Sequence, residues 1–313
     1  MNLIECYEPE FVRQYCKNHP EQQPIDISWQ HEIRRSLLLD DYARCEAILS
    51  HADAFSLHTH QQEQNMDHPV LSRRMQILNQ ATLDIITLPD VAIEIRLYAI
   101  GIMLSYAEKL PGESDDVLQK IAELPQQTKR YAELGILQEM YLKLPSLPQF
   151  QCNLITELSD SDFDWSLLPE SVRKNTFPLQ LSLLVLQDTD SIVSLQQQLF
   201  NEWQSHGVKH FSKTPWVMNN YLIYRIYHDV FPHDNENNII QNYLSLIVDY
   251  FLLRTMLSFW MTEASLSHEE TLAFFALYER WRNSTQGLEQ RQQLGKKILQ
   301  GDHLLSAFSL LNK

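Results

Sequence analysis

The sequence is poor in glycine, which accounts for only seven of its 313 residues. Folds that need many tight turns or glycine-rich loops are therefore disfavoured, and helices are favoured. The chain contains no Gly-x-Gly, no Gly-x-x-x-x-Gly-Lys, no Gly-x-Ser-x-Gly and no His-Glu-x-x-His. These absences exclude the usual dinucleotide-binding turn, the phosphate loop, the nucleophile elbow of hydrolases and the helical zinc site of metalloproteases.

Cysteine is also scarce. The four cysteines, Cys6, Cys16, Cys45 and Cys152, form no Cys-x-x-Cys pair, whereas zinc and iron–sulfur sites usually take closely spaced thiolates. We therefore expect buried, reduced structural cysteines and no zinc or iron–sulfur site. A metal site formed by Cys6, Cys16 and Cys45 is the alternative.

The chain lacks an excess of positive charge and has no long apolar run. Its formal charge is −15, from 40 acidic and 25 basic residues, and the basic pairs are scattered. A nucleic-acid partner is therefore not expected. No uncharged apolar run is long enough to predict a membrane span, and the N-terminus lacks the pattern of a signal peptide. We expect a cytoplasmic protein without a membrane partner, whose acidity suits a lysine-bearing partner.

The residues that are abundant indicate a folded, helical protein. The apolar fraction is 44% and there are six tryptophans, which is typical of globular proteins. The pattern predicts an all-α fold, a multi-helix globular bundle with no repeat solenoid and no doubly wound sheet. Residues 1–30, interrupted by three prolines, are expected to be irregular. Residues 31–313 are expected to form a single helical body, with a sub-domain boundary considered near 144–170.

Apolar residues at helical spacing, and the breaks between them, define the expected elements. Asp188 is expected to cap a helix, Gly207 to end one in the left-handed conformation, and Ser267 with Glu270 to form a capping box. The polar segment 58–67 is expected to be an exposed loop. The predicted helices are 31–50, 69–86, 89–110, 114–124, 126–144, one or two within 176–206, 219–231, about 237–261, one from the cap at Ser267 to about 284, and 288–311.

The stretch 219–261 is the expected centre of the fold. Pro232 must end the first helix because proline lacks the N–H and clashes with the preceding turn. The polar break that follows should cap a second helix at Asn237 or Asn238. That helix repeats apolar residues at three- and four-residue steps from Ile239 onwards. The expected result is a helical hairpin with aromatic side chains on both arms.

The first arm carries residues that could perform chemistry. Tyr221, Tyr224, Arg225 and His228 lie on neighbouring turns. The tyrosines could enclose a lysine ammonium by cation–π attraction, and His228 could accept a proton. Tyrosines at this spacing are more often core residues, and Arg225 with Asp229 is often only a surface pair. Both interpretations remain open.

The second arm is apolar except for Asp249 and Arg254. A carboxylate on such a helix needs a partner, which Arg254 or Arg225 could supply. Asp249 is therefore either part of a structural ion pair, which is the commoner case, or a base that accepts a proton.

Histidines gather around the polar segment 58–67. His58, His60 and His68 could bind a transition metal, since imidazole is a common neutral ligand. A metal-dependent hydrolase is thus a third alternative, but solvated loop histidines are favoured because no acidic orienting group is evident.

The aromatic stretch resembles a known family. The run from Asn220 to Arg225, with Phe231-Pro232 and the helix that follows, is similar to the C-terminal half of flagellin lysine N-methylases, bacterial proteins that methylate lysine side chains of flagellin. The similarity extends upstream through weaker segments. These segments are 96–110, 34–57 and 8–16.

The resemblance implies an activity and a partner. An active member would transfer a methyl group from S-adenosylmethionine to lysine side chains of flagellin, the protein of the bacterial flagellum. The family's N-terminal region is rich in cysteines that are thought to hold a metal cluster, and here only Cys16 is similar to the first of them. The alternative is a catalytically inactive helical protein-interaction module that binds flagellin or another partner. The weak catalytic candidates are Tyr221, Tyr224, His228 and Asp249, and the substrate-groove candidates are Tyr221, Tyr224, Arg225, Asp249 and Arg254.

Overall fold

The computed structural model describes residues 2–64, 68–233, 239–298 and 302–312. They fold into two compact units, and the chain passes between these units several times. The first unit consists of Met1–Leu38, Ala43–Leu137 and Trp216–Ile239. The second consists of Leu39–Tyr42, Gln138–Pro215 and Ile240–Lys313. The segment 144–170, considered as a boundary, lies inside the second unit.

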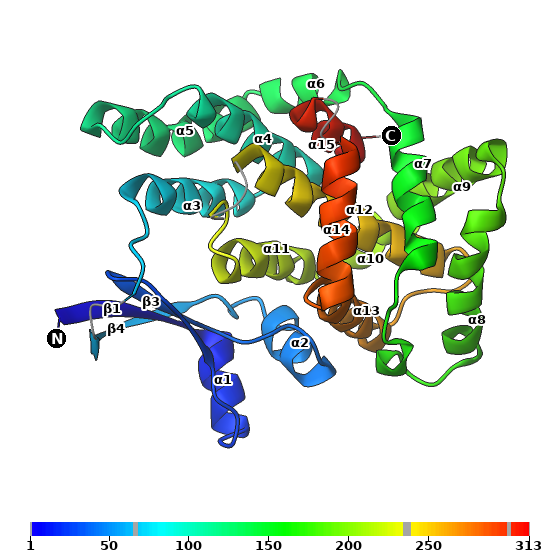
Figure 1. The fold of residues 1–313 in the computed structure, drawn as a ribbon, viewed down its shortest axis with the longest axis horizontal. Helices are drawn as coiled ribbons and strands as arrows, with labels where there is room; N and C mark the ends of the chain where they lie inside the picture. Colours follow the sequence, from blue (N-terminus) through cyan, green and yellow to red (C-terminus); the bar gives the residue numbers. More distant parts are fainter. Residues whose placement is uncertain (1, 65–67, 234–238, 299–301, 313) are drawn as a thin grey trace. The chain divides into compact units, whose positions relative to one another are not determined.

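The first unit combines helices with a small mixed sheet, so the fold is predominantly helical but not all-α. The strand order is β2-β3-β1-β4, with β1 parallel to β3 and antiparallel to β4, and β2 antiparallel to β3. Figure 1 shows helix α1 directly after β1. The elements of this unit are β1 (Asn2–Pro9), α1 (Glu10–Asn18), β2 (Ile25–Ser28), β3 (Glu32–Ser36), α2 (Tyr42–Leu49), β4 (Leu57–Gln64), α3 (Arg73–Ile86), α4 (Ile93–Glu108), α5 (Asp115–Glu133) and α11 (Trp216–His228).

The expectation that residues 1–30 are irregular is wrong. In β1, Ile4 and Cys6 are buried against Ile33 of β3, whereas Leu3 is 66% exposed. This alternation with a period of two is that of a strand with one face in the core. Pro9 ends the strand and stands at the N-cap of α1, so this proline separates two regular elements.

Two further expectations for the N-terminal part are wrong. Residues 31–50 form β3 and the shorter helix α2, because a short apolar run fits both periods. The segment 58–67 lies largely in β4, and residues 65–67 are outside the described residues. β4 is at the edge of the sheet and its side chains are mostly exposed, so it lacks the apolar alternation that marks a half-buried strand.

The helices expected at 69–86 and 89–110 are confirmed as α3 and α4. The break expected at Pro125 is not observed, since α5 continues through it to Glu133. The chain turns instead at Gly135, whose φ of 71° is readily adopted only without a Cβ atom. Helix α6 (Ile136–Leu142) follows.

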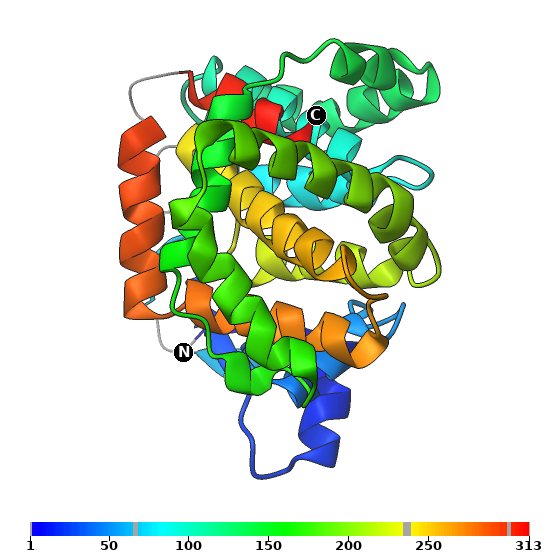
Figure 2. The same cartoon turned by 90° about the vertical axis from the view of Figure 1, so that its right-hand side faces the viewer.

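All regular elements among the described residues of the second unit are helices. Figure 2 shows its green helices and the red α15, which packs on α7. The Asp188 cap is confirmed. Gly207 does not end a helix, because a π-helical segment (Trp203–Gly207) leads directly into α10. The helices are α7 (Pro148–Glu157), α8 (Val172–Ser182), α9 (Thr189–Glu202), α10 (Val208–Ser212), α12 (Ile239–Met261), α13 (His268–Arg282), α14 (Thr285–Ile298) and α15 (His303–Leu311), with short 3-10 turns at Leu158–Asp160, Trp165–Leu167 and Leu183–Leu186.

Two expectations about the C-terminal part need correction. A single helix over 288–311 is wrong, because α14 and α15 are separate elements. The arms of the expected hairpin correspond to the helices α11 and α12, which belong to different compact units. The cap expected at Asn237 or Asn238 lies outside the described residues.

Helix α12 is apolar on all sides. It is long and apolar enough to cross a membrane, but 89% of its most apolar window is buried in the fold. A helix that is apolar all round and covered by protein is typical of the core helix of a soluble protein.

The capping box of α13 provides a test of local stability. Ser267 Oγ accepts a hydrogen bond from Glu270 N at 3.1 Å, and Glu270 Oε2 accepts one from Ser267 N at 2.8 Å. The substitution Ser267→Ala is expected to lower the unfolding free energy by about 1 kcal/mol, because the backbone N–H of Glu270 loses its hydrogen-bond acceptor. Urea denaturation measures this cost. The control Ser245→Ala, at an exposed position inside α12, should lose nothing measurable, and an equal loss in both variants would contradict the capping argument.

Candidate functional site

The aromatic helix α11 places its candidate residues in the core of the first unit. Tyr221 and Tyr224 are fully buried, and Arg225 is 4% exposed. Arg225 donates to Tyr221 Oη at 3.1 Å and to Asp229 Oδ2 at 3.0 Å, so the pair expected on the surface is mostly buried. His228 stacks on Tyr224 with ring centroids 4.9 Å apart. These contacts favour the packing interpretation, and a groove role for these residues stays a prediction.

Asp249 is fully buried within the second unit. Its carboxylate accepts hydrogen bonds from Tyr278 Oη at 2.8 Å, Arg291 Nη1 at 3.0 Å and Arg282 Nε at 3.3 Å. Arg282 also pairs with the buried Glu279 at 3.0 Å. The need for a cationic partner was predictable, but Arg282 and Arg291 were missed because they lie 33 and 42 residues along the chain. The network supports the structural interpretation of Asp249.

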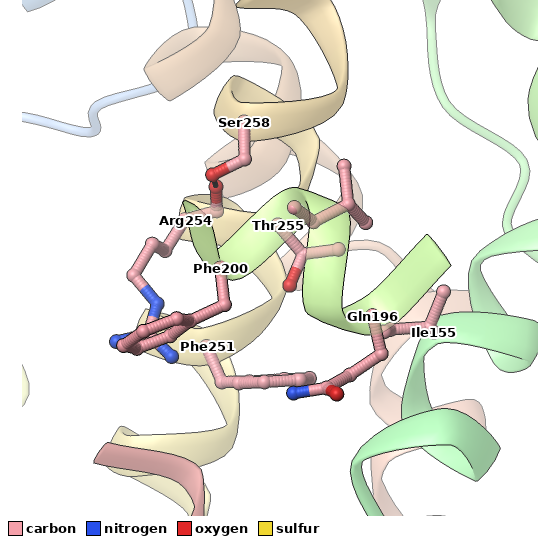
Figure 3. Close-up of a pocket in the computed structure, with 8 residues that line it drawn as sticks. Ile155, Gln196, Phe200, Phe251, Arg254, Thr255 and Ser258 are labelled. Carbon is pink, nitrogen blue, oxygen red and sulfur yellow. Dashed lines mark hydrogen bonds between the residues drawn. The ribbon is translucent and has the colours of Figure 1, made fainter. Parts of the chain in front are cut away.

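Arg254 lines a small cavity, shown in Figure 3. Its guanidinium donates to Leu310 O at 2.9 Å, near the end of α15, and lies 5.6 Å from the ring centroids of Tyr250 and Phe251. Gln196 and Ser258 also line the cavity (Figure 3). The volume is about 20 Å³, which is room for roughly one water molecule. This cavity cannot hold a lysine side chain, and Arg254 instead holds the C-terminal helix in place.

The three cysteines considered as metal ligands lie on three different elements. Cys6 lies on β1, Cys16 on α1 and Cys45 on α2, and all are free thiols. Burial raises the pKa of the Cys6 and Cys16 thiols, which disfavours the thiolate that metals bind. Within residues 2–64, 68–233, 239–298 and 302–312, no three His, Cys, Asp or Glu side chains form a group that could hold a metal ion. The residues present therefore do not fit a cysteine-held cluster.

The histidines of the first unit that were considered as metal ligands do not form a metal site among the described residues either. His58 is on β4, where its Nε2 lies 2.6 Å from Glu10 Oε2 and its Nδ1 lies 2.8 Å from Arg13 Nη1. His60 is on the same strand, and His68 follows the undescribed residues 65–67. Together they form no metal-binding group in the described part of the chain.

A glycine-turned cradle for S-adenosylmethionine is not found in the described part of the chain. The junction where a strand leads into a helix, β1 to α1, has Pro9 at the turn. Such cofactor turns need glycine so that the backbone can approach the ligand closely. The described part of the chain does not fit that mode of binding.

A larger hollow lies in the first unit, lined by residues of α1 and α2 and of the segment before β4. Figure 1 shows these two helices below the sheet. The volume of the hollow is about 480 Å³, within the range of ligand-binding clefts. We call it the acidic groove. It is lined by Glu10, Phe11, Gln14, Tyr15, Asn18, His19, Ala43, Glu46, Ala47, His51, Asp53 and Ala54.

The sequence builds the acidic groove from two helix faces. The α1 residues recur at three- and four-residue steps from Glu10 to Asn18, which places them on one side of that helix. Small side chains at Ala43 and Ala47 of α2 keep the facing surface open. This site was missed from the sequence because residues 1–30 were expected to be irregular, so the periodic face of α1 was not used.

The groove has an apolar floor and a negatively charged rim. Phe11 and Tyr15 are 2% and 7% exposed, whereas Glu46 and Asp53 are exposed. No lysine or arginine is among the lining residues. Hydrogen bonds from Gln14 and His58 lower the pKa of Glu10, so this carboxylate stays ionised at neutral pH. The arrangement suits a guest with an apolar stem and a cationic end.

Two rim carboxylates have no competing partner. Among the described residues, no hydrogen bond or ion pair engages the side chain of Glu46 or Asp53, unlike Glu10, which is 3.5 Å from Arg13 Nη1. Glu46 and Asp53 are therefore available to an incoming cation.

Comparison with known proteins identifies the larger part of the chain. The family model of the FliB lysine N-methylase C-terminal domain matches residues 79–306, which is more than half of the sequence. No curated protein and no solved structure matches the chain. The acidic groove precedes the matched region, whereas α11 and Asp249 lie inside it. The resemblance seen in the sequence is confirmed, and the chain belongs to the flagellin lysine N-methylase family.

Proposed function

We propose that this protein recognises lysine side chains of flagellin in the acidic groove and methylates them. The observation that carries the proposal is the groove itself, with its apolar floor and unpaired carboxylates, in a chain of the lysine N-methylase family. The proposed methyl donor is S-adenosylmethionine, and this part of the proposal rests on the activity of the family alone. The proposed location is the cytoplasm.

The groove offers each part of a lysine side chain a matching surface. The methylene stem can pack on Phe11, Tyr15 and Ala47, and burial of each methylene contributes about 0.8 kcal/mol. The ammonium can then reach Glu46 and Asp53 at the rim, each contact being worth up to about 1 kcal/mol at an exposed site. The groove is thus selective for a long cationic side chain over a neutral one.

Methylation requires the neutral amine, because its lone pair forms the new nitrogen–carbon bond. A nearby group must therefore take one proton from the lysine ammonium. His19 and His51 line the groove, and imidazole is the side chain best suited to exchange a proton near neutral pH. These two histidines are the proposed proton acceptors.

The second candidate is a flagellin-binding module without catalytic activity. It is favoured by Cys6 and Cys16, whose thiol pKa values are raised by burial, and by Pro9 in place of a glycine turn. In this case the groove would hold the lysine without modifying it.

One experiment tests the proposal and separates the two candidates. Purified protein is incubated anaerobically with flagellin from the same organism and S-adenosylmethionine, and lysine methylation is mapped by mass spectrometry. Co-purification with flagellin is measured in parallel. Methylated lysines are the expected result. Binding without methylation would support the module, and the absence of both would contradict the proposed function.

A further inference from the structure

Strand β4 forms an unusually open edge of the sheet. It is the terminal strand in the order β2-β3-β1-β4, and its described side chains are mostly exposed. Proteins commonly protect such edges with lysine, proline or a bulge. The strand, Leu57–Gln64, contains no lysine, arginine or proline and pairs with β1 in an unbroken register. Its backbone can therefore accept a further strand.

The register shows which backbone groups face outward. Glu10 N donates to Ser56 O at 2.9 Å, and the same register continues through Glu8 opposite His58 and Cys6 opposite His60. In an antiparallel pair, every second residue directs its N–H and C=O toward the partner strand. Leu57, Thr59, Gln61 and Glu63 therefore direct theirs away from β1.

This edge leads directly to the acidic groove. Asp53 and Ala54 line the groove, and β4 begins at Leu57. Four residues of chain span at most about 14 Å. His58 on β4 is also held 2.6 Å from the groove residue Glu10. A segment lying along β4 would thus have the groove within reach of its side chains.

We propose that the outer edge of β4 binds an extended, lysine-bearing segment of the protein substrate as an added strand, so that one of its lysines enters the acidic groove. This inference rests on the proposed function and adds the conformation in which the substrate is bound. Charge supports this occupant, because Glu46 and Asp53 line the groove and Glu63 lies on β4, while the nearby cation Arg13 is engaged by Glu10 and His58. Backbone pairing supplies affinity and the groove selects the lysine.

Thr59→Pro tests the edge directly. Proline removes the outward N–H of Thr59 but leaves the hydrogen bonds to β1, which is the arrangement tolerated on edge strands. The matched control Thr59→Val keeps the N–H. Circular dichroism and thermal melting establish that each variant remains folded. If Thr59→Pro is unfolded, Gln61→Pro provides a second variant of the same edge.

The probe is a fluorescent nine-residue peptide of alternating threonine and valine with one central lysine. Fluorescence anisotropy should show about a tenfold loss of affinity with Thr59→Pro and no more than a twofold change with Thr59→Val. A second peptide of the same sequence, N-methylated at alternate backbone nitrogens, should bind weakly. Its affinity should be the same for wild type and for Thr59→Pro. Equal binding by wild type and Thr59→Pro, or by the two peptides, would overturn the inference. If binding is lost in the groove double variant Glu46→Lys and Asp53→Lys but not in Thr59→Pro, only the added strand is refuted. Unchanged binding in the groove double variant would refute the proposed function.

Discussion

Reversing both unpaired charges at the rim of the acidic groove, in the double variant Glu46→Lys and Asp53→Lys, is expected to weaken flagellin binding about 100-fold. Each exposed carboxylate–ammonium contact contributes up to about 1 kcal/mol, and reversal replaces this attraction by a repulsion of similar size. Two reversals then cost up to about 4 kcal/mol. A cost of about 3 kcal/mol, within this limit, corresponds to roughly two orders of magnitude in affinity. Lysine methylation should fall in parallel. Surface plasmon resonance with immobilised flagellin measures the affinity.

A matched control separates the groove from the overall charge of the protein. Glu108 and Glu113 are exposed residues of the first unit outside the groove, and the double variant Glu108→Lys and Glu113→Lys changes the net charge by the same amount. It should bind flagellin within about twofold of wild type at physiological salt, because exposed charges farther apart than about 8 Å are screened. Equal loss in both double variants would show that only the general charge of the surface matters.

Replacing the buried Asp249 by asparagine is expected to destabilise the protein by about 3–5 kcal/mol. Asparagine keeps the shape but removes the anion that Arg291 and Arg282 share, and Arg282 retains only its pair with Glu279. Removing one partner of a buried charge network is costly. The unfolding free energy from urea denaturation provides the measurement.

The control for this variant is Asp116→Asn, which removes an exposed pair with Lys120. An exposed pair of this kind contributes at most about 0.5 kcal/mol. If Asp249 were a catalytic base, Asp249→Asn would instead abolish methylation while leaving stability near that of wild type. A loss of less than about 1 kcal/mol would therefore contradict the structural role.

The helical part of the fold was predictable because its signals are local. α3 and α4 follow from apolar periodicity, and the caps at Asp188 and Ser267 follow from side chains that satisfy the first N–H groups of a helix. The sheet was not predicted, because β4 is polar and β1 shows its alternation over very few residues. A strand at an edge is defined by its backbone partner, Cys6 opposite His60 for example, and this pairing leaves little trace in composition.

The candidate site shows the same limit. The sequence identified Asp249 as a carboxylate that needs a cation, but tertiary packing decides that Arg282 and Arg291 contribute. Tyr221 and Tyr224 stood out because aromatic residues are conspicuous, yet they are buried in the core. In the sequence, the groove residues Glu46 and Asp53 cannot be told from ordinary surface carboxylates. They can be recognised as candidate site residues only in the structure, where α1 and α2 line a hollow beside them.

Zero-length carbodiimide cross-linking tests the central claim most directly, because the reagent joins a carboxylate to a lysine amine only when the two are in contact. The protein is cross-linked to flagellin, digested and mapped by mass spectrometry. We predict that flagellin lysines are joined mainly to Glu46, Asp53 and Glu10, and that free lysine added in excess suppresses these links. Cross-links confined to carboxylates outside the acidic groove would contradict the account.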